Sequence, residues 1–477
     1  MKFSDIIDNS RIAAGGVKDF ATGLVNPSLR LGVTGLARSG KTVFITALVH
    51  ALLHRARLPL FDAQAQGRIA RAYLEPQPND ELPRFAYEEH VAALTGAERH
   101  WPESTRRLSQ LRLTLDYEPQ GLLARNFGSG RMHIDIVDYP GEWLLDLPLM
   151  SMSYAEWSAA TVAASRKHPR DALAKDWHSH MQALDALGTA QELDAVKSAE
   201  LFTEYLSRCR RIDISLSTLP PGRFLMPGDL AGSPLLTFAP LDIAADARIA
   251  SRSLAALMER RYESYVAKVV KPFFYNHFAR LDRQIVLIDV MAALNAGAAA
   301  VQDLQLAMTG VLSCFRQGAN SWSSALFGRR ISRIVFAATK ADLLHHTSHD
   351  RLESILKEIV AEASTRAEFS GAEIDVAALA AIRATREAIV RQKGEELRCI
   401  AGIPEAGETI GDETFDGAGE AAVFPGDLPA DPRQALTGEL EGALKFVKFR
   451  PPLLTGTTFP HIRLDRAMEF LIGDRFS

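Results

Sequence analysis

The stretch GLARSGKT, residues 35–42, fits the pattern G-x-x-x-x-G-K-[ST] of a phosphate-binding loop. The apolar run LRLGVTG before it predicts a short buried strand, and TVFITALVHALLHRA after it predicts a helix. This order of strand, glycine loop and helix directs backbone N–H groups and a helix N-terminus towards an anion. The alternative is an accidental glycine turn before a helix.

Each residue of the loop then has an expected role. Lys41 would reach the β- and γ-phosphates of a nucleotide, and the hydroxyl of Thr42 would ligate Mg²⁺. The other nucleotide contacts that we expect from this loop are Gly35, Ala37, Arg38, Ser39, Gly40 and Val43.

A second motif, D-x-x-G, follows the predicted strand HIDIVD at residues 138–141. In GTPases this pattern places the aspartate near the metal and the glycine N–H on the γ-phosphate, so we expect Asp138 to lie near Mg²⁺ and Gly141 near the phosphate. The next residue is Glu142, where many GTPases have a glutamine that orients water. A carboxylate accepts a hydrogen bond from water but repels the γ-phosphate, which predicts slow or partner-dependent hydrolysis.

A third motif, TKAD at residues 339–342, follows the apolar strand RIVFAA and fits [NT]-K-x-D. The carboxylate of Asp342 would accept from two guanine N–H groups that adenine lacks, and the stem of Lys340 would pack along the base. The alternative is a charged turn that starts a helix. Ligands bind outside the carboxyl ends of strands in an open α/β sheet, and the three motifs occur in the order that this arrangement needs.

Two fainter segments complete the predicted site. The turn at Ala384 and Thr385 ends an apolar run and resembles the short turn that closes over guanine in GTPases. Ser104 and Thr105 precede an alternating run that predicts a strand, and Thr105 is our candidate for a second Mg²⁺ ligand. A capping Ser or Thr after a proline turn is the alternative there.

The spacing of the motifs predicts an α/β P-loop fold with a mostly parallel sheet flanked by helices and a large, mainly helical insertion. About 200 residues separate D-x-x-G from TKAD, where a minimal GTPase has a few dozen. We therefore expect a discontinuous G domain at residues 29–144 and 281–400, with the insertion at 145–280. The other expected segments are a helical leader at 1–28, an irregular acidic Gly/Pro-rich stretch at 401–434, and a C-terminal part at 435–477 that packs back on the G domain.

Composition limits the location and the partners of the chain. Its formal net charge of −4 gives no overall attraction to nucleic acid, so we expect no nucleic-acid partner. The N-terminus lacks the apolar region of a signal peptide, and no window reaches the roughly 18 apolar residues of a membrane span. Its three cysteines show no metal-ligand spacing. These features predict a cytoplasmic protein.

The motif set GLARSGKT, DYPGEW, LIDVMAALNAG, ATKADLL and FPHIRLDRAMEF resembles the YcjX family of bacterial P-loop proteins over nearly the whole chain. The resemblance implies a stress-associated cytosolic protein that binds GTP and GDP, with a partner at the inner membrane. The phosphate loop is also similar to that of the guanylate-binding proteins, which implies that Arg38 acts as an internal arginine finger. A second copy of the chain is a candidate for the partner that would turn Arg38 onto the phosphates. The alternatives are a solvated arginine that only raises the local positive potential and an ion pair between Arg38 and Glu142.

The function that we expect is slow, Mg²⁺-dependent GTP hydrolysis in a nucleotide-controlled switch or assembly factor, with Arg38, Lys41 and Glu142 as the catalytic candidates. Two alternatives stay open from the sequence. One is an ATPase or nucleotide kinase that uses the same loop. The other is a scaffold that binds GTP or GDP with negligible hydrolysis.

Overall fold

The computed structural model describes residues 28–36, 38–103, 107–120, 130–211, 215–244, 246–313, 331–369, 371–392 and 394–476. The expected helical leader at 1–28 therefore lies outside the described residues except for Ser28.

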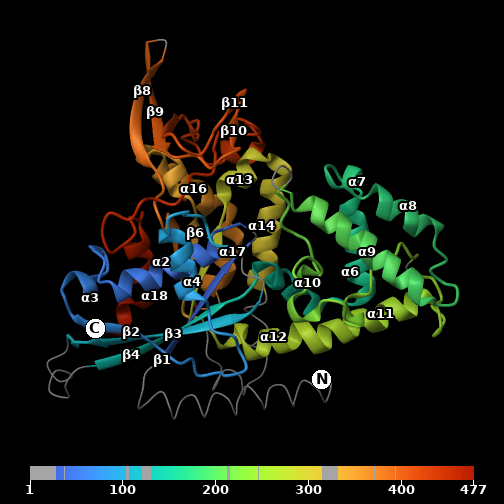
Figure 1. Cartoon of the computed structure of the whole chain (residues 1–477). Helices are drawn as coiled ribbons and strands as arrows, with labels where there is room; N and C mark the ends of the chain where they lie inside the picture. The colour runs from blue at the N-terminus through green and yellow to red at the C-terminus, as the bar shows by residue number, and fades with distance from the viewer. Residues whose placement is uncertain are drawn as a thin grey trace.

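A seven-stranded sheet forms the centre of the molecule (Figure 1). Its strands, in spatial order, are β2 (Ile69–Glu75), β3 (Ser109–Tyr117), β4 (Gly130–Asp138), β1 (Ser28–Gly35), β5 (Arg283–Ile288), β6 (Arg333–Ala338) and β7 (Glu373–Ala378). The five strands from β4 to β7 are parallel to one another, and β3 runs antiparallel to both β4 and β2. The expected α/β fold with a mostly parallel sheet is confirmed.

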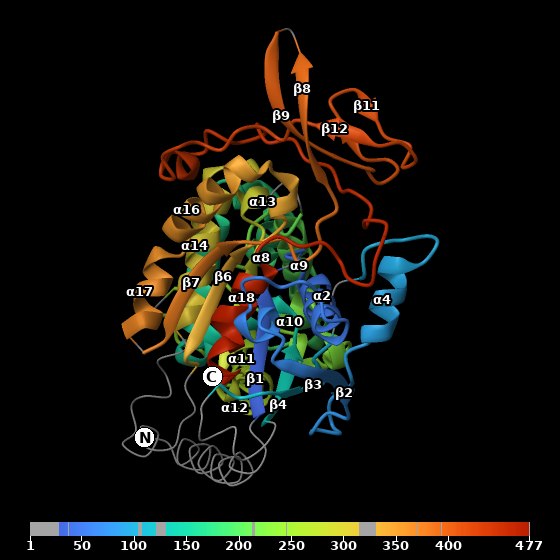
Figure 2. The ribbon, with the colours of Figure 1, turned by 90° about the vertical axis from the view of Figure 1, so that its left-hand side faces the viewer.

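The sheet is buried on both faces because its strands alternate apolar side chains between two cores. In β5, Ile285 and Leu287 face one core, and Val286 and Ile288 face the other. The first core contains residues of α2 (Lys41–Leu53), α3 (Asp62–Ala65), α4 (Tyr87–Thr95) and α18 (Leu464–Ile472). The second contains residues of α13 (Val290–Asn295), α14 (Ala298–Ser313), α16 (His349–Ile359) and α17 (Ala361–Phe369). Figure 2 shows the sheet between these layers.

The segment between β4 and β5 is mainly helical and lies to one side of the sheet (Figure 1). Its helices are η1 (Gly141–Ser151), α6 (Tyr154–Ser165), α7 (Arg170–Leu173), α8 (Lys175–Ala183), α9 (Glu192–Cys209), α10 (Gly222–Leu225), η2 (Gly228–Leu230), η3 (Pro234–Leu236), α11 (Leu254–Tyr265), η4 (Val266–Val270), α12 (Lys271–Asn276) and η5 (Phe278–Arg280). Aromatic rings fill its interior: Trp157 stacks on Tyr262 with ring centroids 5.1 Å apart, and Trp177 stacks on Tyr205 at 5.2 Å. We refer to residues 145–280 as the insertion.

A buried ion pair joins the insertion to the sheet layers. Arg170 Nη2 lies 2.7 Å from Asp303 Oδ1 on α14. The other oxygen of Asp303 accepts from the backbone N–H groups of Ser217 and Thr218, each at 2.6 Å. One carboxylate thus fixes both α7 and the loop after α9 against α14. Additional hydrogen bonds of this kind are what a buried ion pair needs to be tolerated.

The C-terminal third differs from the expectation in one respect. Strands β8 (Arg386–Gln392) and β9 (Glu395–Gly402) form a hairpin outside the central sheet and pair with β12 (Ala421–Val423). The stretch 401–434, expected to be irregular, holds this strand and a second hairpin of β10 (Thr409–Ile410) and β11 (Glu413–Thr414). A small core of Ile400, Val423, Val447 and Phe449 supports them, which explains why a Gly/Pro-rich sequence is ordered here. The β8–β9 hairpin projects from the molecule in both overall views.

The last residues return to the sheet. Arg283, at the start of β5, donates to the carbonyl of Leu471 at 3.1 Å and pairs with Asp474 at 2.8 Å. The remaining short elements are η7 (Ala341–Leu343), η8 (His346–Ser348), η9 (Gln434–Thr437) and η10 (Gly473–Phe476). Across the described ranges, no helix has both the length and the apolar character needed to cross a bilayer.

Candidate nucleotide-binding site

The predicted phosphate loop joins the end of β1 to the start of α2. Gly40 adopts a left-handed conformation with φ of 82°, which glycine reaches without steric cost, and α2 begins at the next residue. Arg38 is also left-handed, with φ of 64°, an uncommon conformation for a residue with a side chain. The loop therefore turns sharply and directs the N-terminus of a long helix towards its centre.

The side chains of the loop are nearly enclosed. Lys41 and Thr42 are 8% and 6% exposed, and Thr42 donates to the carbonyl of Glu103 at 3.3 Å. The hydroxyl of Ser39 is buried and has no hydrogen-bond partner within the described part of the chain. Buried polar atoms are normally bonded, so this hydroxyl fits a site that takes a polar ligand.

The D-x-x-G segment lies directly against the phosphate loop. Strand β4 pairs in parallel with β1 and places Asp138 opposite Val33. A Cβ atom at Gly141 would fall 1.7 Å from the carbonyl oxygen of Gly35, so only glycine permits this approach. The structure thus brings Asp138, Gly141 and the start of the loop to one edge of the sheet.

The TKAD segment lies at the same edge, two strands away from β1. Lys340 adopts a left-handed conformation and forms an ion pair with Asp289, which follows β5 and caps α13. Asp342 accepts from the backbone N–H of Ala384 at 2.9 Å, and the hydroxyl of Thr385 donates to the Asp342 carbonyl. The two segments predicted to contact guanine therefore meet, although 42 residues separate Asp342 from Ala384.

Asp342 is only 7% exposed. Burial raises the pKa of its carboxyl to about 6, and the Ala384 N–H together with the nearby Arg383 and Lys340 opposes that rise. At neutral pH the ionised carboxylate is present but poorly hydrated. Such a group gains from a ligand that offers N–H donors.

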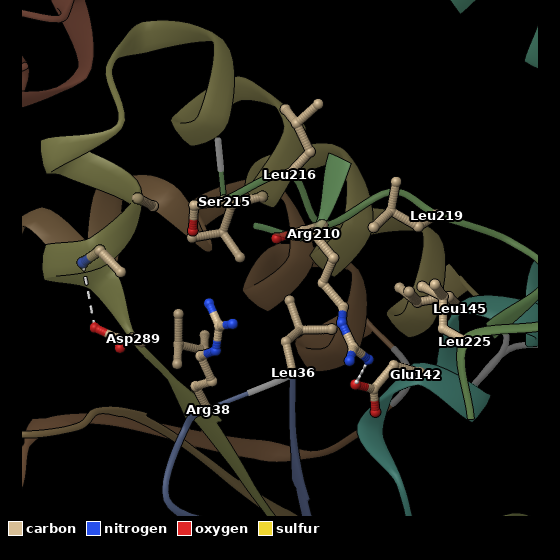
Figure 3. Close-up of a pocket in the computed structure, with 15 residues that line it drawn as sticks. Leu36, Arg38, Glu142, Leu145, Arg210, Ser215, Leu216, Leu219, Leu225 and Asp289 are labelled. Atoms are coloured by element: carbon tan, nitrogen blue, oxygen red, sulfur yellow. Dashed lines mark hydrogen bonds and ion pairs between the residues drawn. The ribbon is translucent and has the colours of Figure 1, made fainter. Parts of the chain in front are cut away.

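A cavity of about 70 Å³ opens beside the phosphate loop and is shown in Figure 3. The loop contributes Leu36 and Arg38, and the segment after D-x-x-G contributes Glu142 and Leu145. Its other walls come from the insertion, the end of β5, α13 and α14: Arg210, Ser215, Leu216, Ser217, Leu219, Leu225, Ile288, Asp289, Ala292, Ala293 and Leu304. The insertion is thus part of the same site as the phosphate loop.

The sequence left open an ion pair between Arg38 and Glu142. In the structure Glu142 pairs with a different arginine. Glu142 Oε1 accepts from Arg210 Nη1 at 2.9 Å, and Figure 3 shows the guanidinium of Arg38 on the other side of Leu36. The reason is local backbone geometry, since the left-handed conformation at Arg38 carries its exposed side chain towards Ser215.

The insertion also contacts Glu142 through its backbone. A Cβ atom at Gly222 would lie 1.8 Å from the Glu142 carbonyl oxygen, and the Gly222 N–H donates to the buried Asp146 at 2.6 Å. Asp146 accepts a second bond from Tyr265 at 2.5 Å. Burial raises the pKa of Asp146 to about 6, against the effect of these two donors. The residue after D-x-x-G is therefore held by the insertion on two sides.

Several residues of the site were not predicted from the sequence: Glu103, Arg210 and Asp289. Asp289 carried a detectable signal, because it ends a buried strand at the sheet edge where ligands bind. Arg210 carried none, because it lies 68 residues from Glu142 among other arginines. Two predicted contacts, Ala37 and Thr105, lie outside the described residues and stay predictions.

The donor set fits a nucleotide with Mg²⁺. The hydroxyl of Thr42 and the carboxylate of Asp138 are oxygen ligands of the type that Mg²⁺ prefers, and both are nearly buried at the loop. The space beside the left-handed Gly40 is open, which leaves room for phosphate oxygens close to the backbone of the loop.

Comparison with known proteins identifies the family of the chain. The model of the YcjX-like family, DUF463, matches residues 29–476. The chain is 38% identical to the Ras-like GTPase YcjX of Escherichia coli K12 over 463 residues, which cover 94% of this chain and 96% of that protein. It is 34% identical to the Ras-like GTPase YcjX of Shewanella oneidensis over 473 residues, with 94% of each chain covered. On this evidence the chain belongs to the YcjX-like family.

Proposed function

We propose that the protein binds GTP and GDP with Mg²⁺ and hydrolyses GTP slowly as a nucleotide-controlled switch or assembly factor. The observation that carries the proposal is that Asp342 and Lys340 lie at the same sheet edge as the phosphate loop. An ATP site has no need of a buried carboxylate that accepts two N–H groups. The names of the two relatives, both Ras-like GTPases, support the same function.

In the proposed binding mode, the ammonium of Lys41 and the N–H groups at the start of α2 hold the β- and γ-phosphates. The Asp342 carboxylate accepts from the two guanine N–H groups. The Ala384 N–H donates to Asp342 in the structure, so the turn at Ala384 and Thr385 would close over the base beside this carboxylate. In this mode Val43 would border the phosphate end of the site and Thr385 the base end.

Thr42, Asp138 and Thr105 would hold Mg²⁺, which supplies positive charge to the β- and γ-phosphate oxygens. Hydrolysis forms a bond between a water oxygen and the γ-phosphorus and breaks the bond to the β–γ bridging oxygen. The bond electrons stay with GDP, and the water protons pass to phosphate and solvent. The carboxylate of Glu142 accepts a hydrogen bond from the attacking water but adds negative charge near the γ-phosphate, which keeps the reaction slow.

The cellular proposals rest on family resemblance. They are a stress-related role in the cytoplasm, a protein partner at the inner membrane and a homodimer that covers the site.

Side-by-side calorimetry and turnover with GTP, GDP and ATP test the proposed function. We expect Mg²⁺-dependent binding of GTP and GDP, at least about a hundredfold weaker binding of ATP, and measurable phosphate release from GTP. Equal affinity for ATP would contradict the guanine assignment. Binding of GTP with no phosphate release would leave the scaffold as the function.

A second expectation concerns the insertion, which we propose acts as a gate that responds to the nucleotide. Arg210 and Gly222 contact Glu142 directly, so a γ-phosphate that moves Glu142 must disturb both contacts. Hydrogen exchange with GDP and with a non-hydrolysable GTP analogue should differ in residues 215–225 and at the end of α9. Helix α18 is an internal control that should not change. Identical protection of the insertion in both states would remove the gating proposal.

A further inference from the structure

Arg210 brings a positive charge from the insertion to the phosphate loop. It follows α9 directly as the residue that caps the helix, and its guanidinium extends towards Glu142 (Figure 3). The Arg210 side chain is 32% exposed, whereas that of Glu142 is 6% exposed. The pair is therefore anchored on the Glu142 side, and the guanidinium keeps access to the cavity.

The route from Arg210 to the phosphate loop is short. Glu142 is the neighbour of Gly141, and Gly141 touches the backbone of Gly35. Arg38, which is part of the loop, lines the same cavity as Arg210. A guanidinium bonded to Glu142 thus lies beside the place where the γ-phosphate would meet the Gly141 N–H.

Two other arginines of the insertion are fixed in a way that Arg210 is not. Arg170 bonds to Asp303, Tyr205 and the carbonyl of Thr218. Arg223 packs its guanidinium over the ring of Trp143, 3.1 Å from the centroid. Glu142 is the one carboxylate within ion-pair distance of Arg210 in the described part of the chain. Arg210 is itself partly exposed and has a single carboxylate partner, so it can exchange that partner for a phosphate group, which offers more charge and more acceptor oxygens.

We infer that Arg210 is an arginine finger that the insertion supplies to the nucleotide site of the same chain. This inference rests on the proposed GTP hydrolysis. With GTP bound, the guanidinium of Arg210 leaves Glu142, donates to the γ-phosphate oxygens and neutralises the charge that develops as the β–γ bridging bond breaks. The Glu142 carboxylate, released from the ion pair, then accepts from the attacking water. The insertion thereby provides in cis what other GTPases take from a partner protein.

The inference differs from the role expected for Arg38. Arg38 moves with the phosphate loop itself, whereas Arg210 depends on the position of the insertion. If Arg210 is the finger, hydrolysis requires the insertion to stay closed on the site. Hydrolysis would then not require a second copy of the chain.

The test is single-turnover GTP hydrolysis by the full chain, together with GTP and GDP affinity, for Arg210→Ala, Arg210→Lys and Arg38→Ala. Arg208→Ala is the matched control, because Arg208 lies on the same helix and pairs with Asp176 and Glu204. We expect Arg210→Ala to slow hydrolysis by at least about a hundredfold with both affinities within about threefold. Arg210→Lys keeps the charge for Glu142 but lacks the planar fork, so it should be nearly as slow. Arg208→Ala should behave as the wild type.

The outcomes separate this inference from the proposed function. A wild type that hydrolyses GTP together with an Arg210→Ala variant within fivefold of its rate overturns the inference alone. The same holds if Arg210→Lys restores the rate, because Arg210 would then only hold Glu142 in place. A large loss in Arg38→Ala with none in Arg210→Ala assigns the finger to the loop. A wild type without any turnover overturns both the proposed hydrolysis and the inference.

Discussion

Lys41→Ala should weaken the binding of GDP and GTP by about a thousandfold, which corresponds to about 4 kcal/mol. Lys41 is 8% exposed at the first position of α2, so its ammonium and a bound phosphate would meet with little water between them. Charge-assisted hydrogen bonds are among the strongest polar contacts, and losing one partner leaves the other uncompensated. Calorimetry with GDP in the presence of Mg²⁺ measures the change directly.

The control for this substitution is Lys357→Ala. Lys357 is largely exposed on α16 and pairs with Glu353, so its removal should leave GDP affinity unchanged. Thermal unfolding of both variants checks that the fold is intact, and alanine at the start of α2 is favourable for a helix. Unchanged GDP affinity in a folded Lys41→Ala variant would show that the loop is not the phosphate site.

The sheet and the order of its motifs could be predicted from the sequence because their signals are local. Strands β1, β4, β5 and β6 are short apolar runs, and each of the three motifs follows one of them directly. The loop needs a left-handed conformation at Gly40, and this requirement arises from the backbone of the loop alone. Parallel strands then bring their carboxyl ends to one edge without further information.

The contacts of the insertion could not be predicted in the same way. The bond between Arg210 and Glu142 spans 68 residues, and the ion pair of Arg170 with Asp303 spans 133. Both depend on how the aromatic core of the insertion packs against α14 and η1, which no periodic pattern encodes. An arginine that pairs across domains looks like any surface arginine in the sequence. Residues 281–400 were assigned to the G domain, and the strands β8 and β9 at the end of that range pair with β12 outside the central sheet.

The guanine end of the site could be predicted only in part. The TKAD motif is a local signal, but the turn that contacts it comes from a distant part of the chain. Asp342 is fixed at the end of β6 by its own segment, whereas Ala384 and Thr385 reach it after β7. The bonds between these residues orient the Asp342 carboxylate before any base binds. Preorganisation of this kind makes the loss of a single acceptor costly.

Asp342→Asn should therefore reduce GDP affinity by about a thousandfold and favour xanthosine diphosphate, whose base carries an oxygen where guanine has an amino group. The asparagine amide would donate to that oxygen, whereas it would oppose the guanine amino group donor to donor. Calorimetry with both nucleotides measures the switch, and Asp350→Asn, an exposed substitution on α16, is the control that should bind GDP normally.

Because the pKa of Asp342 is about 6, wild-type GDP affinity should also fall about tenfold as the pH is lowered to 5, since only the ionised carboxylate accepts both N–H groups. The phosphates of GDP titrate in the same way with either protein. The difference in the pH dependence of GDP affinity between the wild type and Asp342→Asn therefore reports the titration of the Asp342 carboxylate alone. An Asp342→Asn variant that still prefers GDP over xanthosine diphosphate would mean that another residue reads the base.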